Sequence, residues 1–105
     1  MEVVYANRLA WGHVQPCPEC IGLAAVIEAG HLGDKVWIEG PQGYEGPFLV
    51  VDCANAAHVE KLRERRLVAE VDWQTAQRWD MQGPIEGRVL FMSPFDRRLS
   101  LKLLE

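Results

Sequence analysis

Short runs of β-branched, aromatic and aliphatic residues recur along the chain. Residues 3–5 form the first run, and residues 35–39 alternate charged and bulky side chains like a half-buried strand. Residues 48–51 are continuously apolar, which predicts a strand buried on both faces. Residues 67–71 and 88–92 have the same strand character.

Two segments favour helices instead. Residues 54–66 have apolar positions at helical spacing, and Asn55 is a suitable cap. Asp72 is a good N-cap for a second short helix over residues 73–79. Residues 21–29 fit either a helical turn or a strand that crosses a barrel.

Loops rich in glycine and proline separate these elements, notably over residues 7–18, 40–47 and 81–87. Leu99, Leu101 and Leu103 alternate with polar residues, which predicts a final or edge strand. The expected fold is mainly β, with five or six strands and one or two short helices. A small closed barrel is the economical arrangement, because closure removes sheet edges.

The composition is typical of one folded domain over residues 1–105, with 49% hydrophobic and 25% charged residues. The net charge of -4 argues against a nucleic-acid partner. The one basic cluster, residues 61–66, is interpreted as a solvated helix face or as a grip on an anionic polymer. We expect no membrane span, because no apolar run approaches the required length of about 20 residues. We also expect a monomer.

Five segments together resemble the double-psi β-barrel family of rare lipoprotein A, barwin, the expansin N-terminal domain and the family 45 endoglucanases. Two of them are centred on aspartates: a strand that ends in Asp52-Cys53 (residues 46–53) and a helix that Asp72 begins (residues 71–79). The others are a glycine–valine strand (residues 83–89), an Ala-Ala segment (residues 22–25) and a leucine–glycine–valine strand (residues 32–36). The resemblance implies a six-stranded double-psi β-barrel.

The same resemblance implies a protein of the cell envelope or the secreted fraction that binds or cuts cell-wall polysaccharide such as peptidoglycan. The chain starts without a secretory signal, so a mature domain of an exported precursor and a cytoplasmic protein are both open. Val26 stands where the rare lipoprotein A group has histidine, and Cys53 follows Asp52 where that group has arginine. These departures favour binding, with weak or lost lytic activity, over cleavage.

Glycan cleavage requires a proton donor and a second carboxylate. By resemblance the candidates are Asp52 and Asp72, and Glu19 in the cysteine loop is a third. Each aspartate follows an apolar run, so we expect both to emerge beside the core in a common cleft. The structural alternatives are a helix cap for Asp72 and a loop-amide acceptor for Asp52.

Aromatic side chains offer flat faces on which a pyranose ring stacks. Trp11 and Tyr44 lie in predicted loops and are the first candidates, with Trp73 beside Asp72 as another. His31 is the histidine nearest the Ala-Ala segment and is a candidate for the missing family histidine.

The three cysteines, Cys17, Cys20 and Cys53, leave several states open. Together with His58 or His13 they complete a zinc ligand set, which would make the chain a zinc-stabilised interaction module. The family resemblance implies instead a disulfide, Cys20–Cys53 or Cys17–Cys53, that closes a loop of about 30 residues and stabilises by about 3–4 kcal/mol. In a cytoplasmic protein, free buried thiols are expected. No cofactor other than zinc is indicated.

Overall fold

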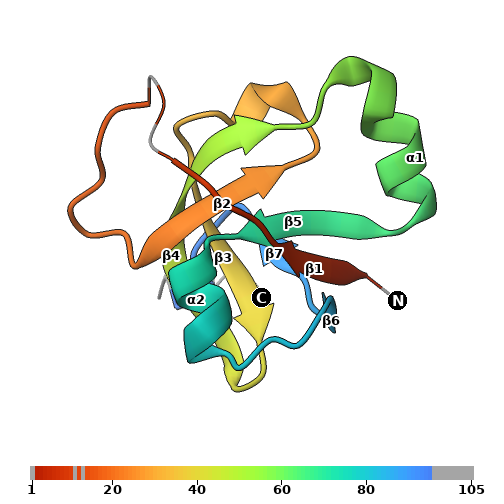
Figure 1. Cartoon of the computed structure of the whole chain (residues 1–105). Coiled ribbons are helices and arrows are strands. Elements are labelled where there is room, and N and C mark those ends of the chain that lie inside the picture. The colour runs from red at the N-terminus through yellow and green to blue at the C-terminus, as the bar shows by residue number, and fades with distance from the viewer. Residues whose placement is uncertain (1, 11, 13, 96–105) are drawn as a thin grey trace, which may run out of the picture.

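A single curled sheet forms most of the molecule in the computed structural model, which describes residues 2–10, 12 and 14–95 (Figure 1). The described residues contain seven strands: β1 (Val3–Ala6), β2 (Gly22–Val26), β3 (Lys35–Gly40), β4 (Gly43–Cys53), β5 (Leu67–Val71), β6 (Ile85–Glu86) and β7 (Val89–Leu90). The helical segments are short: η1 (Ala29–His31), η2 (Ala56–His58), α1 (Val59–Glu64) and α2 (Trp73–Arg78).

The strands are paired in the order β6-β1-β5-β2-β4-β3-β7. β1 runs parallel to β5, and β2 runs parallel to β4. Between these two parallel pairs, β2 and β5 pair antiparallel, and β6 and β3 each pair antiparallel on the outer sides. Along the order β6-β1-β5-β2-β4-β3 the pairs are antiparallel, parallel, antiparallel, parallel and antiparallel. This pattern of directions is symmetrical about the central β5–β2 pair.

The two outermost strands, β6 and β7, are neighbours in the chain. β6 pairs with β1, and β7 pairs with β3. Between them the Gly87 amide donates to the Glu2 carbonyl at 3.1 Å, and the Arg88 carbonyl accepts from the Glu39 amide at 2.8 Å. The segment 85–90 thus contacts both edges of the curled sheet.

Alternating side chains divide the sheet into an inner and an outer face. The inner face carries the main core, in which Phe48 and Trp79 pack edge to face with their ring centroids 6.0 Å apart. Its buried members are Val4, Ala24, Val26, Val36, Ile38, Phe48, Val50, Ala69, Val71 and Trp79. On the outer face Leu49 and Val51 form a second, smaller cluster with Cys17.

The predicted mainly β fold with short helices is confirmed, and residues 48–51 are buried on both faces. The open segment 21–29 contains strand β2. The expected long loop over residues 40–47 is wrong: Gly40 pairs with Gly43, so a tight turn joins β3 directly to the long strand β4. The expected six strands differ from the seven that the described residues contain.

The other expected elements are close to those observed. Asn55 caps η2 by accepting from the Ala57 amide at 3.0 Å, and α1 follows within the predicted helical region. The strand expected over residues 88–92 is reduced to β7, and β6 lies in the expected loop. The strand expected around Leu99, Leu101 and Leu103 lies outside the described residues.

A polar contact holds α2 against β4. Glu45 accepts from Arg78 Nη1 at 2.8 Å and from the Trp79 indole. Burial alone raises the pKa of Glu45, but these hydrogen bonds and the charge of Arg78 hold the pKa below its ordinary value. The ionised carboxylate is therefore the form that stabilises this contact.

Replacing Gly87 by alanine should destabilise the fold. Gly87 is buried, and an added Cβ would lie 2.6 Å from the Glu39 carbonyl oxygen, where backbone must shift. We expect Gly87→Ala to lower the free energy of unfolding by about 1–3 kcal/mol in urea denaturation. Gly83→Ala is the matched control, because nothing lies within 4 Å of its added Cβ. Equal stability of the two variants would contradict a close approach of the sheet edges at Gly87.

The Glu45 contact should be pH-dependent. Because the pKa of Glu45 is depressed in the folded state, its stabilisation is present above the ordinary carboxyl pKa and is lost as pH falls through the folded value. We expect Glu45→Gln to cost up to about 1 kcal/mol at pH 7 and to match wild type in acid. Denaturation across pH 2–7 checks this, with Glu64→Gln as the surface control; a constant difference at all pH values would refute it.

Candidate functional site

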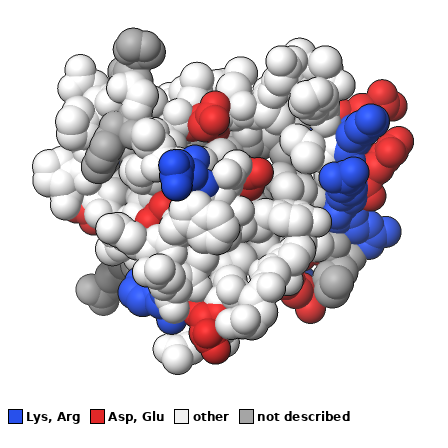
Figure 2. Space-filling view, in the orientation of Figure 1, with Lys and Arg blue, Asp and Glu red and all other residues white. Residues whose placement is uncertain are grey.

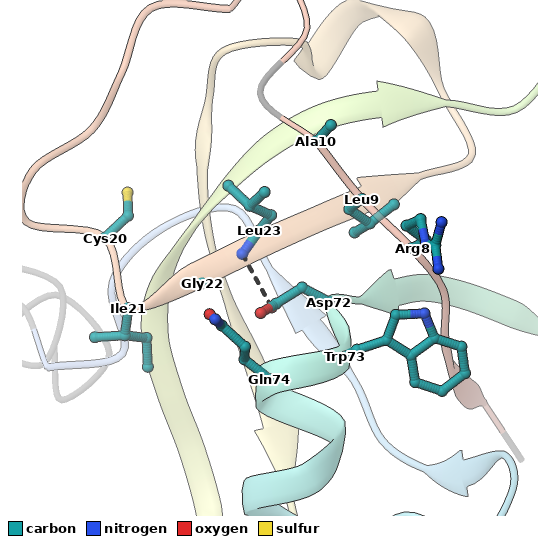
Figure 3. A pocket seen from close by; sticks show the side chains of 10 residues that line it. All are labelled: Arg8, Leu9, Ala10, Cys20, Ile21, Gly22, Leu23, Asp72, Trp73 and Gln74. Carbon is teal, nitrogen blue, oxygen red and sulfur yellow. Dashed lines mark hydrogen bonds between the residues drawn. The ribbon is translucent and has the colours of Figure 1, made fainter.

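A cavity with a volume of about 530 Å³ opens where β2 begins and β5 passes into α2. We name it the Asp72 pocket (Figure 3). Three short segments line it, the chain after β1, the start of β2 and the start of α2: Arg8, Leu9, Ala10, Cys20, Ile21, Gly22, Leu23, Asp72, Trp73 and Gln74. The lining therefore mixes aliphatic, aromatic and polar side chains, as ligand sites do.

Asp72 lies at the base of this pocket and ties two strands and a helix together. Its Oδ1 accepts from the Leu23 amide at 3.1 Å and from Thr75 Oγ1 at 2.8 Å, while Oδ2 accepts from the Thr75 amide at 3.4 Å. The Asp72 amide donates in turn to the Leu23 carbonyl at 3.3 Å. Asp72 thus continues the β2–β5 ladder and caps α2, as predicted for a helix cap.

Gly22 makes this junction possible. A Cβ at Gly22 would lie 2.8 Å from both Asp72 Oδ1 and Thr75 Oγ1. A larger residue would therefore displace the carboxylate that accepts from β2.

The upper walls of the pocket present exposed side chains on opposite sides. Figure 3 shows Trp73 and Arg8 on one side of Asp72 and Ile21 and Cys20 on the other. Trp73 is 53% exposed and Ile21 is 47% exposed, so both present apolar surface to solvent. Trp73 is the predicted ligand-binding residue that the structure places beside Asp72.

Asp52 does not line the Asp72 pocket. It pairs with Ala25 on the β4 side of β2, whereas Asp72 flanks Leu23 on the β5 side. Two strand spacings of about 4.8 Å and two residue rises of about 3.3 Å put the two backbone positions on the order of 12 Å apart. Asp52 is exposed and accepts at 2.8 Å from the Cys53 amide, so the expected common cleft is not formed.

Asp52 lies instead in a small cavity of about 60 Å³ on the outer face of the sheet, together with Glu70 and Cys53. Glu70 pairs with Ala25 from the β5 side, and its Oε2 accepts from Asn7 Nδ2 at 3.0 Å. Both carboxylates therefore flank Ala25 across β2.

Glu19 is engaged elsewhere as well. It forms an ion pair with Lys35, and both side chains are about half exposed, at 54% and 46%. The hydrogen bond from Lys35, with the loop backbone, holds the pKa of Glu19 below its ordinary value. A general acid in glycan cleavage requires a raised pKa, so this environment suits a surface ion pair better than a proton donor.

Tyr44 and His31, two of the other predicted ligand-binding residues, do not line the Asp72 pocket. Tyr44 is half-buried in β4, where burial and the neighbouring Glu39 raise its pKa. His31 stacks on Phe91 with ring centroids 4.1 Å apart, and its Nδ1 lies 3.2 Å from Asp34 Oδ2. Trp11 and His13 lie outside the described residues.

The predicted bridges to Cys53 are wrong, because the structure joins Cys17 to Cys20. The Cys20 amide donates to the Cys17 carbonyl at 3.1 Å, and this tight turn brings the two Cα atoms to 5.4 Å, within disulfide range. Cys53 pairs with Val26 at the far end of β2, a whole strand away from Cys20, and is a free thiol.

A zinc set also lacks geometric support among the described residues. His58 is exposed at the end of η2, and no group of three or more potential ligands is found in the part of the chain that the structure describes. Disulfide-bonded Cys17 and Cys20 provide no thiolates, which zinc requires.

One cluster of charged side chains lies at α1, which does not line the Asp72 pocket. Figure 2 shows basic and acidic side chains mixed along the edge where α1 lies in Figure 1. Arg63 in this helix lies 3.0 Å from Glu28, so the predicted basic cluster is in part neutralised by acids. None of the described helices is long and apolar enough to cross a membrane.

Most of the residues that line the pocket were not predicted from the sequence, among them Arg8, Ile21 and Gln74. Gln74 directly follows Trp73 in the helix that Asp72 caps, so the predicted cap could have indicated Gln74 as a neighbour of Asp72. Arg8 and Ile21 belong to irregular segments, and only the fold brings them together.

Comparison with known proteins gives no match: no family profile, no curated protein sequence and no solved structure is similar enough to this chain to be identified as a relative.

Removing the Asp72 carboxylate should cost considerably more stability than removing that of Asp52. Asp72→Ala leaves the Leu23 amide and the buried Thr75 hydroxyl without their acceptor, so we expect a loss of about 2–3 kcal/mol. Asp52→Ala should stay within about 0.5 kcal/mol of wild type. Urea denaturation of both variants measures this difference. Similar losses for the two would show that Asp72 does not hold the junction.

Proposed function

We propose that this protein binds a strand of cell-envelope polysaccharide in the Asp72 pocket. The observation that carries the proposal is a half-exposed tryptophan, Trp73, at the wall of the Asp72 pocket. The face of an exposed indole suits the apolar side of a pyranose ring.

The polar groups around Trp73 suit sugar hydroxyls. Arg8 and Gln74 supply N–H donors, and Gln74 also supplies a carbonyl acceptor. Asp72 Oδ2 accepts only one long hydrogen bond, at 3.4 Å, and so retains capacity for a hydroxyl donor. In this proposal Trp73 stacks, Arg8 and Gln74 select the hydroxyl pattern, and Leu9 and Ile21 contact the apolar edges of neighbouring rings.

We propose binding without cleavage. Asp72 is the one carboxylate that the described residues contribute to the pocket. The two-carboxylate mechanism requires a second acid within about 5–9.5 Å across the bond. Asp52 lines a different cavity and Glu19 pairs with Lys35, which leaves both proposed partners of Asp72 engaged elsewhere.

From the family resemblance we also propose that the curled sheet is a closed, double-psi-type barrel. In this barrel β6 and β7 act as one bent strand, which gives six strands. The palindromic pairing around β2 and β5 and the contacts of segment 85–90 with both sheet edges support it. The Cys17–Cys20 disulfide supports an exported protein, because disulfides persist in oxidising compartments.

Binding should depend on the Trp73 indole. We expect wild type to sediment with peptidoglycan sacculi and Trp73→Ala to bind about tenfold more weakly, since stacking and its contact area are lost. Phe95→Ala is the matched control, because Phe95 is 68% exposed and does not line the pocket. Cellulose and chitin serve as alternative polymers. Retention on none of the three polymers, or equal retention of both variants, would refute the proposal.

A further inference from the structure

The segment between β1 and β2 forms a loop, and its described residues (7–10, 12 and 14–21) include several that pack against the outer face of the sheet. Its Leu9, Val14 and Cys17 pack with Leu49 and Val51 of β4. This cluster has no member in common with the main core on the inner face. The loop is therefore anchored separately from the rest of the fold.

Both ends of this loop line the Asp72 pocket. Arg8, Leu9 and Ala10 come from its beginning, and Cys20 and Ile21 come from its end. The second wall is held by the disulfide, by the bond from the Cys20 amide to Cys17, by the packing of Cys20 in the outer cluster, and by a bond from the Ile21 amide to the Pro47 carbonyl at 2.8 Å. The Cys17–Cys20 bridge is the one covalent contact among these, and it closes the turn directly before Ile21.

The two sulfur atoms differ in accessibility. Cys17 is 6% exposed within the outer cluster, whereas Cys20 is partly exposed and lines the pocket. Figure 3 shows the Cys20 sulfur at the edge of the pocket. An incoming thiol therefore reaches Cys20 Sγ first, and exposed disulfides are the ones that exchange readily.

We propose that the Cys17–Cys20 disulfide is a thiol–disulfide exchange site, through which a dithiol reductant alters the wall of the Asp72 pocket. A thiolate of the dithiol attacks Cys20 Sγ, the Cys17–Cys20 bond breaks, and Cys17 leaves as a thiolate that takes up a proton. The second thiol of the reductant then attacks the reductant's sulfur in the mixed disulfide. Cys20 leaves as a thiolate that takes up a proton. The reductant becomes a disulfide, and the protein gains two electrons and two protons.

The consequence is local. The bridge spans three positions along the chain, so its loss frees one turn and leaves the inner core intact. In the reduced form the Cys17–Cys20 turn opens, and Ile21 is held by the bond from its amide to the Pro47 carbonyl and by the pairing of Gly22 with Phe48. For a bound glycan, which rests on the proposed function above, this loosens one of the two walls.

Hydrogen exchange of the full chain, with and without dithiothreitol, tests the exchange site without any ligand. On reduction the amides of Cys20 and Ile21 should exchange severalfold faster, because local opening of the turn exposes them without unfolding the sheet. The Val50 amide, which donates to the Asp34 carbonyl, should change less than about twofold. The double variant Cys17→Ser/Cys20→Ser should exchange at the fast rate under both conditions, and Cys53→Ser should behave as wild type.

Unchanged rates at Cys20 and Ile21 would overturn the proposal, and so would equal acceleration at Val50, which would indicate global unfolding. Binding of a soluble chitin oligosaccharide or peptidoglycan fragment is measured in the same two states, and we expect weaker binding on reduction because the wall is less pre-organised. If neither state binds any glycan while the exchange rates differ as expected, the polysaccharide proposal fails and the exchange site stands.

Discussion

The carboxylate of Asp72 is the contact on which the arrangement of the site depends. It accepts from β2 through Leu23 and from α2 through Thr75, so one side chain positions a strand and a helix that are distant in sequence. Because Asp72 is only 8% exposed, these hydrogen bonds form in a partly desolvated environment where an unpaired acceptor is costly. The pocket, its tryptophan and its glutamine follow from where this carboxylate holds the start of α2.

The position of Trp73 is a direct result of that cap. The buried residues of α2 are Thr75 and Ala76. Trp73, the first residue of the helix, is exposed and lies next to the carboxylate that caps the helix. An aromatic platform beside an anchored acid is thus built by five consecutive residues, while Arg8 and Ile21 complete it from the loop over residues 7–21.

Much of the fold was predictable because it rests on local patterns. The alternation in residues 35–39, the apolar run at 48–51 and the cap at Asp72 each depend on nearby residues, and the structure contains the corresponding elements. Register is a long-range property and could not be read from these patterns. The shared cleft for Asp52 and Asp72 failed for this reason: both follow apolar runs, but they flank β2 on opposite sides. The cysteine pairing failed likewise, since a local turn joins Cys17 to Cys20 and the parallel register puts Cys53 at the other end of β2.

The most direct test of the central claim is backbone amide NMR of the full chain during titration with a soluble peptidoglycan fragment. The account predicts chemical-shift changes that concentrate at Arg8, Ile21, Leu23, Trp73 and Gln74 and saturate with one affinity. Shifts centred on α1 or on the small cavity around Asp52, or no shifts at millimolar ligand, would contradict it.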